Sequence, residues 1–401
     1  MGAVTFWSAG RGARFDDMAE MTPRERVVTV LNHQEPDRVP LDIGGGGATS
    51  IVVEGYERLK RALGISSETR MMNKVFRVAF LDESVMQRLG SDCRLVTAKP
   101  SSRLAPKDLD ENTFTDVWGV MWRKAYYGDG CHYWDLAKSP LAEATVEDLD
   151  RYPWPDPSDL SRTKGLAEEA KALHDNTNYA FVGDGGFKSF WELAWTMRGL
   201  EQMLTDLVVN LEFVTALLDK LLEINIAATG PFLDAVGRYI QVFRTGDDLA
   251  TQTGLLMSAK TYRTLLKPVY KRYLDFVRSK TDARIFYHSC GNITDLVDDL
   301  VEIGITTVNP VQVSALGDTA ALKVRFGQRV TFWGGIDTQH VLPHGSVADV
   351  EAEVRQRIHD LGPSGGYLAG AVHNIQPDVP PENILALADA VRKYGTYPLT
   401  V

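Results

Sequence analysis

Residues 284–292 read RIFYHSCGN, so an apolar run from Arg284 to Tyr287 passes directly into the polar segment 288–292. Short apolar runs bounded by Gly and polar residues are typical of buried parallel strands. The same organisation returns along the chain: each run ends in Gly, Asp or Asn and leads into a helical pattern. Repeated strand–helix alternation predicts parallel strands joined by right-handed crossovers.

Eight apolar runs of this kind are expected to form strands. They are residues 39–43, 93–97, 179–182, 239–244, 284–287, 306–309, 330–333 and 367–372. Eight strand–helix units favour an α/β fold closed into a (β/α)8 TIM barrel. An open doubly wound sheet is the alternative. However, no G-x-G-x-x-G follows the first strand, and the glycines at 44–47 have the wrong spacing for that dinucleotide-binding motif.

Helix signals divide the chain further. Thr22, Pro23 and Glu25 form a capping box with proline at the first helical position, so the ordered fold is expected to begin there. Residues 1–20 then form an N-terminal extension, and residues 21–401 a single barrel domain. Further helix starts are expected after Ser258, after Ser346, and at Pro381-Glu382.

Two segments depart from plain alternation. Residues 113–127 alternate apolar and polar side chains around several aromatic residues, which predicts a β-hairpin inserted after the second strand. Residues 200–235 carry long helical periodicity, so extra helices are expected after the third strand.

Composition narrows the function classes. The 401 residues are 44% hydrophobic and 24% charged, with a net charge of −10 and no Lys/Arg-rich run, which argues against a nucleic-acid partner. No apolar stretch approaches the ~18 residues of a membrane span, and the N-terminus lacks the pattern of a signal peptide. Cys93, Cys131 and Cys290 are scattered and form no disulfide framework, so we expect a cytoplasmic, soluble protein, with oligomerisation left open.

Polar side chains gather where the predicted strands end, and strand interiors hold almost none. They are Asp42, Asp184, Asp247, Asp248, His288, Cys290, Asn309, Gln312, Asp337 and His373. Reactive groups of (β/α)8 barrels lie at the C-terminal ends of the strands. The sequence therefore predicts an enzyme whose active site lies at that end of the barrel.

His288 and Cys290 stand two residues apart in an extended segment, so their side chains are expected to share a face. Imidazole and thiolate are preferred ligands of Zn²⁺, and a catalytic zinc keeps three protein ligands and one open position. His373, at the end of the last predicted strand, is the natural third ligand. The alternative is structural: Cys290 is a small buried hydrophobe and His288 a hydrogen-bonded core histidine.

The acidic residues also admit two interpretations. One carboxylate of the pair Asp247-Asp248 is expected to cap the following turn, while its neighbour faces the cavity. Asp184, between glycines, is either a turn residue or a ligand-facing carboxylate. His340 and His344 are expected at the surface, and His132 in the inserted hairpin.

Several longer motifs resemble the uroporphyrinogen decarboxylase superfamily. They are residues 21–40, GDDLATQ at 246–252 (ending in Gln252), YRTLLKPVY at 262–270, HSCGN at 288–292, and HNIQPDVPPEN at 373–383. The resemblance runs in collinear order over residues 21–396 and implies a (β/α)8 barrel.

Two differences from true uroporphyrinogen decarboxylases indicate which branch of the superfamily the chain resembles. True uroporphyrinogen decarboxylases carry arginines after the first strand to hold substrate carboxylates, whereas residues 42–47 (DIGGGG) contain none. The H-x-C element at His288 and Cys290 instead resembles the zinc-dependent corrinoid methyltransferases, such as methylcobalamin:coenzyme M methyltransferase. Those use a second, distant cysteine where this chain has His373.

Zinc held by one thiolate and two neutral imidazoles keeps a net charge of about +1, which suits activation of an oxygen-bearing substrate. We therefore expect a zinc-dependent methyltransferase acting between a small O- or S-methyl compound and a corrinoid, either free or on a separate corrinoid protein, since the chain has no D-x-H-x-x-G segment. The residues expected to contact or orient substrate are Asp184, Asp247, Asp248, Gln252, Asn309, Gln312 and Asp337. A metal-free decarboxylase and a non-catalytic binding barrel are the alternatives.

Overall fold

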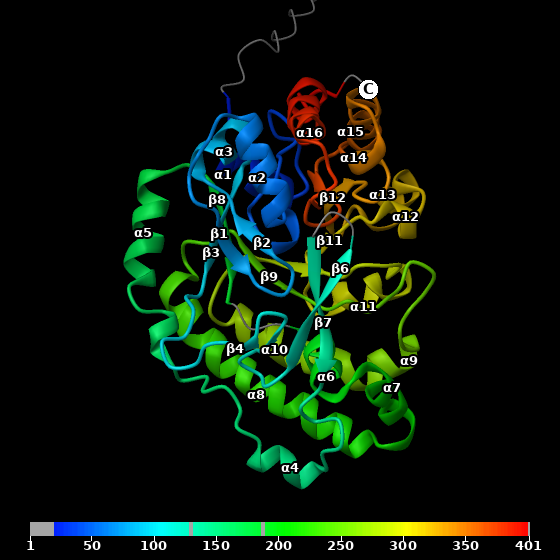
Figure 1. Ribbon diagram of the computed structural model, residues 1–401. Helices are drawn as coiled ribbons and strands as arrows, with labels where there is room; N and C mark the ends of the chain where they lie inside the picture. The colour runs from blue at the N-terminus through cyan, green and yellow to red at the C-terminus, as the bar shows by residue number, and fades with distance from the viewer. Residues whose placement is uncertain (1–19, 128–130, 186–188, 400–401) are drawn as a thin grey trace, which may run out of the picture.

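The computed structural model describes residues 20–127, 131–185 and 189–399 (Figure 1). The predicted N-terminal extension, apart from Glu20, lies outside the described residues. The centre is a seven-stranded sheet in which every pair of neighbouring strands is parallel. The strands lie side by side in the order in which they follow one another along the chain. Its strands are β3 (Cys93–Thr97), β8 (Ala180–Asp184), β9 (Val242–Gly246), β10 (Arg284–His288), β11 (Thr307–Asn309), β12 (Thr331–Ile336) and β13 (Tyr367–Ala371).

The first predicted strand, residues 39–43, is shorter than expected. Only Leu41 pairs with β13, through a single parallel bridge to Ala369. On the other side, the N–H of Asp92 donates to the Leu41 carbonyl at 2.8 Å, so this segment fills the gap between β13 and β3. Pro40 has no N–H to extend the pairing, and the glycines at 44–47 turn the chain away. The fold is an α/β barrel of the TIM type.

The barrel interior is filled by side chains that alternate along the strands. Val182, Val242 and Phe286 belong to one buried cluster with residues of β3, β12 and β13. Val27 and Leu31 of helix α1 (Pro23–Leu31) join the same cluster and close the N-terminal end of the barrel. Because side chains on a strand alternate, residues two and four places beyond these interior positions point into the opposite, C-terminal mouth.

The helices cover the outer face of the sheet (Figure 1). Between β8 and β9 lie α6 (Trp191–Arg198), α7 (Leu200–Val209) and α8 (Leu211–Val236), which confirms the predicted extra helices. The others are α2 (Val53–Ala62), α3 (Glu83–Leu89), α4 (Val146–Arg151), α5 (Leu166–Asn176), α9 (Ala259–Thr261), α10 (Lys267–Arg278), α11 (Val297–Glu302), α12 (Val313–Leu316), α13 (Thr319–Phe326), α14 (Val341–His344), α15 (Val347–Leu361) and α16 (Pro381–Tyr394). Short turns of other helix types are η2 (Gly47–Thr49), η3 (Leu160–Arg162), η4 (Tyr262–Leu266) and η5 (Thr294–Leu296).

The predicted helix starts are confirmed. The Thr22 side chain accepts from the Glu25 N–H in a capping box. Ser258 accepts from the Thr261 N–H, and Ser346 forms a capping box with Asp349. Local cap chemistry was therefore sufficient to position these helix ends.

The insertion after β3 is larger than the predicted hairpin. It is a four-stranded antiparallel sheet of β4 (Lys107–Asp110), β5 (Thr113–Thr115), β6 (Met121–Tyr127) and β7 (Cys131–Lys138). The prediction over 113–127 captured β5 and β6 but missed β7, the longest partner of β6. A small antiparallel pair, β1 (Arg70–Asn73) and β2 (Val78–Phe80), was also missed, because strands of four and three residues are too short to show a clear alternation.

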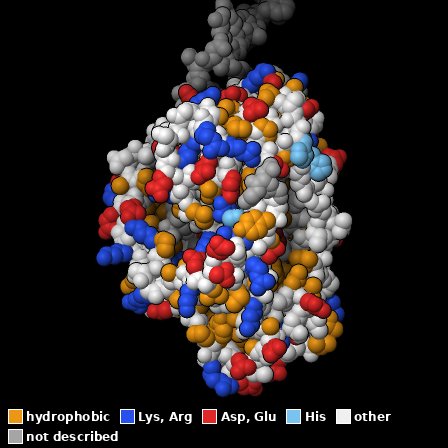
Figure 2. Space-filling model, in the orientation of Figure 1, with side chains coloured by type: hydrophobic (Ala, Val, Ile, Leu, Met, Phe, Trp, Pro, Cys, Tyr) orange, Lys and Arg blue, Asp and Glu red, His pale blue; other side chains and the backbone are white. Residues whose placement is uncertain are grey.

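Acidic and basic side chains are interspersed over the face shown in Figure 2. Among the described residues, no helix combines the length and apolar character needed to cross a bilayer.

Candidate metal centre

Three predicted ligands come together at the C-terminal mouth of the barrel. His288 ends β10, Cys290 follows two residues later, and His373 lies two residues beyond the end of β13. One ligand atom from each residue lies within 4.8 Å of the other two. The His288 Nε2 is 3.5 Å from the Cys290 Sγ, and the two imidazole centroids are 5.5 Å apart. Strands β10 and β13 are not neighbours in the sheet, so barrel curvature brings these groups together.

The His288 ring is fixed in one tautomer. Asn309 donates its Nδ2–H to the Trp333 carbonyl at 3.0 Å, and a carbonyl can only accept. Its Oδ1 therefore faces the His288 Nδ1, 2.6 Å away, and accepts a hydrogen bond from the Nδ1–H. This leaves the Nε2 lone pair of His288 directed toward Cys290, as a metal ligand requires.

His373 reaches the same tautomer by another route. Its Nδ1 donates to the Asn374 Oδ1. That oxygen also accepts from the Gln376 Nε2 at 3.0 Å, and the same nitrogen donates to the Asn374 carbonyl at 3.1 Å. Because both orientations are set by an obligate acceptor, the Nε2 of His373 also carries a free lone pair.

The charge state of the cluster fits a cation. Burial lowers the pKa of His288 to about 4 and also lowers the pKa of His373, so both imidazoles are neutral at pH 7. Burial, followed by the negative charges of Asp248 and Glu192, raises the pKa of the Cys290 thiol. A divalent cation would relieve that negative potential and ionise the thiol. The donor set of two imidazoles and one thiolate matches the preferences of zinc.

The pair Asp247-Asp248 is divided between structure and site. The Asp247 carboxylate is fully buried and accepts the N–H groups of Phe190, Trp191 and Glu192 at 2.7–2.9 Å, together with the Tyr270 hydroxyl. It caps the distant helix α6, not the following turn that the sequence suggested. Its capacity as an acceptor is filled by these donors, which leaves it no evident role in binding substrate.

Asp248 faces the cluster instead. Its Oδ1 accepts the Cys290 N–H at 2.7 Å and lies 3.8 Å from the His288 Nε2. Its side chain is 37% exposed, so a substrate can reach it. One carboxylate thus holds the helix scaffold while its neighbour borders the candidate centre.

The loop that carries Cys290 is held by Ser289, which follows β10, and by Gln312, which follows β11. Gln312 accepts the Gly291 N–H at 2.7 Å. Gly291 has φ +86°, and a Cβ there would lie 2.5 Å from the Ala250 carbonyl oxygen, so only glycine suits this close approach. The Ser289 hydroxyl accepts the Leu249 N–H at 3.1 Å. Gln312 therefore positions the ligand loop.

Asp184 meets a charged partner that the sequence reasoning missed. The Arg244 Nη1 donates to the Asp184 Oδ2 at 3.0 Å, and both side chains are about one-fifth exposed (21% and 22%). Arg244 is two residues beyond the interior Val242, so strand alternation could have identified it as a mouth residue. Its charge contributes to the lowered pKa of both His288 and His373.

Two further predicted residues lie at the rim. The Asp337 Oδ1 accepts the Gln339 N–H at 2.7 Å, so Asp337 organises the turn after β12. The exposed Gln252 donates to the Gln339 side chain at 3.1 Å. These contacts join two rim loops but do not reach the three ligand atoms.

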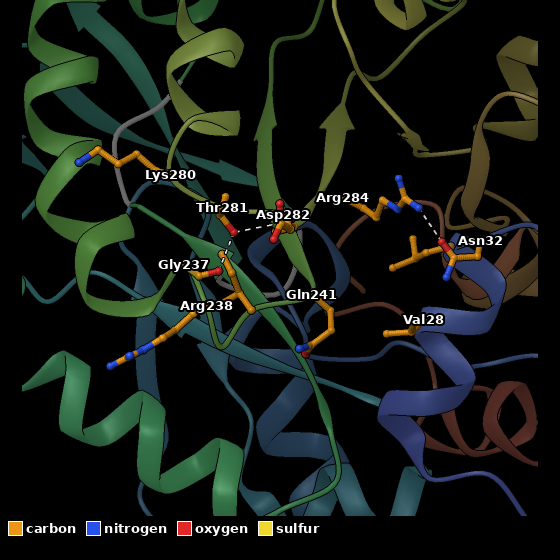
Figure 3. Close-up of a pocket in the computed structure, with 12 residues that line it drawn as sticks. Val28, Asn32, Gly237, Arg238, Gln241, Lys280, Thr281, Asp282 and Arg284 are labelled. Carbon is orange, nitrogen blue, oxygen red and sulfur yellow. Dashed lines mark hydrogen bonds between the residues drawn. The ribbon is translucent and has the colours of Figure 1, made fainter.

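One surface hollow is remote from this centre. It has a volume of about 670 Å³ and is lined by residues at the beginnings of strands, including Gln241 just before β9 and Arg284 at the start of β10, and by Val28 of α1 (Figure 3). Lys280 is paired with Asp234 at 2.8 Å, and Arg284 with Asn32. Because its lining includes the beginnings of β9 and β10, this hollow lies at the N-terminal end of the barrel, which in such barrels contributes to stability and not to catalysis.

Comparisons with known proteins agree with the fold. Over residues 136–394 the chain matches the family model described as uroporphyrinogen decarboxylase (URO-D). It is 26% identical to a uroporphyrinogen decarboxylase of Pseudoalteromonas atlantica over 45% of this chain and 48% of that protein, about half its length. A uroporphyrinogen decarboxylase of Magnetococcus marinus is 24% identical over 64% of this chain and 72% of that protein.

A solved structure, a methyltransferase from Methanosarcina mazei, superposes with a TM-score of 0.64. It is 18% identical in sequence and covers 94% of this chain and 99% of its own, so the likeness concerns the fold. The family match covers well over half of the chain and includes β8 to β13 with His288, Cys290 and His373. The chain belongs to the uroporphyrinogen decarboxylase (URO-D) family.

Proposed function

We propose that this protein is a zinc-dependent methyltransferase that exchanges a methyl group between a small O- or S-methyl compound and a corrinoid co-substrate. The observation that supports it best is the convergence of His288 Nε2, Cys290 Sγ and a nitrogen of His373 within 4.8 Å of one another. The alternative of a structural Cys290 and a core histidine gives no reason for two imidazoles to present free nitrogens to one thiol.

His288, Cys290 and His373 would hold the zinc, which, when bound, supplies a Lewis acid for the oxygen or sulfur of the substrate. The chain's own residues prepare that position. Asn309 and Asn374 orient the imidazoles, and Asp248 fixes the Cys290 backbone. Because Asp248 is also exposed, its carboxylate can accept a hydrogen bond from a substrate hydroxyl or take up a proton.

The Arg244–Asp184 pair supplies a second polar wall of the mouth. We assign to it the orientation of the substrate's polar end. In the reaction the substrate loses its methyl group as the carbon–oxygen or carbon–sulfur bond breaks, and the leaving anion is protonated. The methyl group passes to the reduced corrinoid, delivered free or by a separate corrinoid protein.

Metal analysis of the purified protein tests the zinc assignment. We expect about one equivalent of zinc in the wild type and a large loss in Cys290→Ala and His373→Ala. Cys131→Ala, which removes a cysteine of β7, serves as the matched control and should retain the metal. Less than about half an equivalent in the wild type, unchanged in Cys290→Ala, would argue against the proposal.

A second candidate is a metal-free decarboxylase acting on a small carboxylate. It is favoured by the two curated relatives, both named uroporphyrinogen decarboxylase. In that case His373 would exchange a proton with substrate and Asp248 would stabilise a cationic intermediate. Release of CO₂ that survives chelation and Cys290→Ser would select this function, whereas methyl transfer abolished by both treatments would select the first.

A further inference from the structure

The inserted sheet reaches the candidate metal centre through a chain of hydrogen bonds. Tyr133 of β7 donates its hydroxyl to the Gln376 Oε1, across 243 positions of sequence. Gln376 in turn donates to Asn374, which accepts from the His373 Nδ1. We propose that Tyr133 and Gln376 are positioning residues that fix the metal-binding orientation of His373, so that the insert is a working part of the site.

Each step of this chain has a defined polarity. The Gln376 Nε2 must face the Asn374 carbonyl, which can only accept, so its Oε1 is left for Tyr133. The Asn374 Oδ1 receives two donors, from Gln376 and His373, and cannot rotate away without losing both. The chain thus excludes the alternative in which the Asn374 amide nitrogen faces the imidazole.

Tyr133 is well placed to anchor this chain. Its ring stacks on Tyr127 of β6 with centroids 4.7 Å apart and planes 17° from parallel. Burial raises the pKa of Tyr133, so its hydroxyl remains a donor at neutral pH. The neighbouring residue of the same strand, His132, has its Nε2 3.2 Å from the Nη1 of Arg77, which directly precedes β2. Strand β7 is therefore held by two consecutive residues, through Gln376 and through Arg77.

The expected effect of these residues on metal binding rests on the proposed function, whereas their effect on the His373 tautomer does not. Outer hydrogen-bond partners of a metal-binding histidine set its tautomer and ring angle, and their loss commonly weakens metal binding about 10- to 100-fold. Gln376 acts through one intervening residue and Tyr133 through two. We therefore expect a larger effect from Gln376→Leu than from Tyr133→Phe.

The first measurement is made on metal-free protein labelled with ¹⁵N histidine. In the wild type, the His373 Nδ1 should be protonated and the Nε2 unprotonated. In Gln376→Leu the Asn374 amide is free to rotate and present its nitrogen, so the Nε2–H tautomer should become populated. Tyr133→Phe should give an intermediate spectrum. Tyr126→Phe is the matched control, because Tyr126 in the same hairpin is 64% exposed and its hydroxyl contacts Asn112 instead.

The second measurement is titration with Co²⁺, whose absorption bands report the ligand geometry. We expect affinity to fall about 10-fold or more in Gln376→Leu, by a smaller factor in Tyr133→Phe, and not in Tyr126→Phe. Identical His373 signals in the wild type and both variants would overturn the inference. A tautomer change in a protein that binds no metal would uphold the positioning role and reject the proposed function instead.

Discussion

At the scale of single residues, the candidate centre depends on orientation as much as on ligand identity. Each imidazole is held by an asparagine whose amide orientation is itself fixed. Asn309, beside His288, donates to the Trp333 carbonyl, whereas Asn374, beside His373, accepts from Gln376, whose Nε2 also donates to the Asn374 carbonyl. Asparagine is suitable because its two ends differ: one donates and the other accepts. A ligand held in this way needs little reorganisation when a metal binds.

Replacement of Asn309 tests this argument. Asn309→Leu removes the acceptor of the His288 Nδ1–H, so zinc affinity should fall about 10- to 100-fold in a competition titration with a chromophoric chelator. Asn309→Asp keeps an acceptor at that position and should retain zinc within a few-fold of wild type. Equal losses in the two variants would show that the acceptor is not the reason for the effect.

At the scale of elements, a side chain at the end of one strand caps the start of a helix that belongs to another part of the chain. Asp247 follows β9, yet it caps α6, an element more than fifty residues earlier in the sequence. A carboxylate at a helix N-terminus satisfies unpaired N–H groups and interacts favourably with the helix dipole. This capping holds Glu192 and the surrounding loop beside the mouth.

Asp247→Asn replaces one accepting oxygen by an NH₂ group that opposes the backbone N–H donors. We expect a loss of about 1–3 kcal/mol in the free energy of unfolding at pH 7, measured by urea denaturation. Asp248→Asn, one residue away, keeps an oxygen for the Cys290 N–H and should change stability by less than about 0.5 kcal/mol.

The same carboxyl group gives a pH dependence. Burial raises the folded-state pKa of Asp247 to about 6, above its value of about 3.9 in an unfolded chain. The folded state therefore binds this proton more tightly, and the group's contribution to stability falls as pH rises from about 4 to 6. The stability difference between wild type and Asp247→Asn should shrink over that range. A difference that grows instead would contradict the raised pKa.

At the scale of the whole molecule, the two ends of the barrel have different roles. The C-terminal mouth carries the candidate centre, whereas α1 closes the N-terminal end. There the buried Arg26 bonds to Asp92 at 2.7 Å and to Asp37 at 2.6 Å. These contacts connect α1 to the segment that closes the barrel and to β3.

Arg26→Met should therefore destabilise the fold without altering the metal site. Breaking a buried pair costs roughly 3–5 kcal/mol, and we expect the lower end because Arg38 still pairs with Asp92. Urea denaturation measures the loss, and zinc content of the folded protein should be unchanged. A loss of zinc without a loss of stability would contradict the assignment of Arg26 to the stability of the fold.

Zinc should in turn stabilise the folded chain. A ligand that binds only the folded state at about 100 times its dissociation constant adds about 2.7 kcal/mol. We expect a rise in the urea midpoint when zinc is added to chelator-treated protein, and no rise in Cys290→Ser. An equal rise in both proteins would indicate zinc binding elsewhere on the molecule.

Local patterns in the amino-acid sequence are enough to predict the barrel and most of its elements. Apolar runs, glycine turns and capping boxes are local signals. They predicted eight strands, of which seven form the sheet and the first is only a single bridge, and the helix starts at Thr22, Ser258 and Ser346. Strand alternation also grouped His288 with Cys290. The four-stranded insert was only partly predicted, since strands that are half exposed lose the alternation that reveals them.

Only the tertiary structure decided which distant residues meet. Sequence spacing could nominate His373, but the closure of the barrel sets its distance from Cys290. The tertiary structure also shows that Asp247 accepts hydrogen bonds from α6, whereas Asp248 accepts the Cys290 N–H. It places Arg244 beside Asp184 and Tyr133 beside Gln376, which sequence patterns did not predict. Local patterns specify which face of a strand a residue occupies, whereas the partner across the mouth depends on how all the strands curve together.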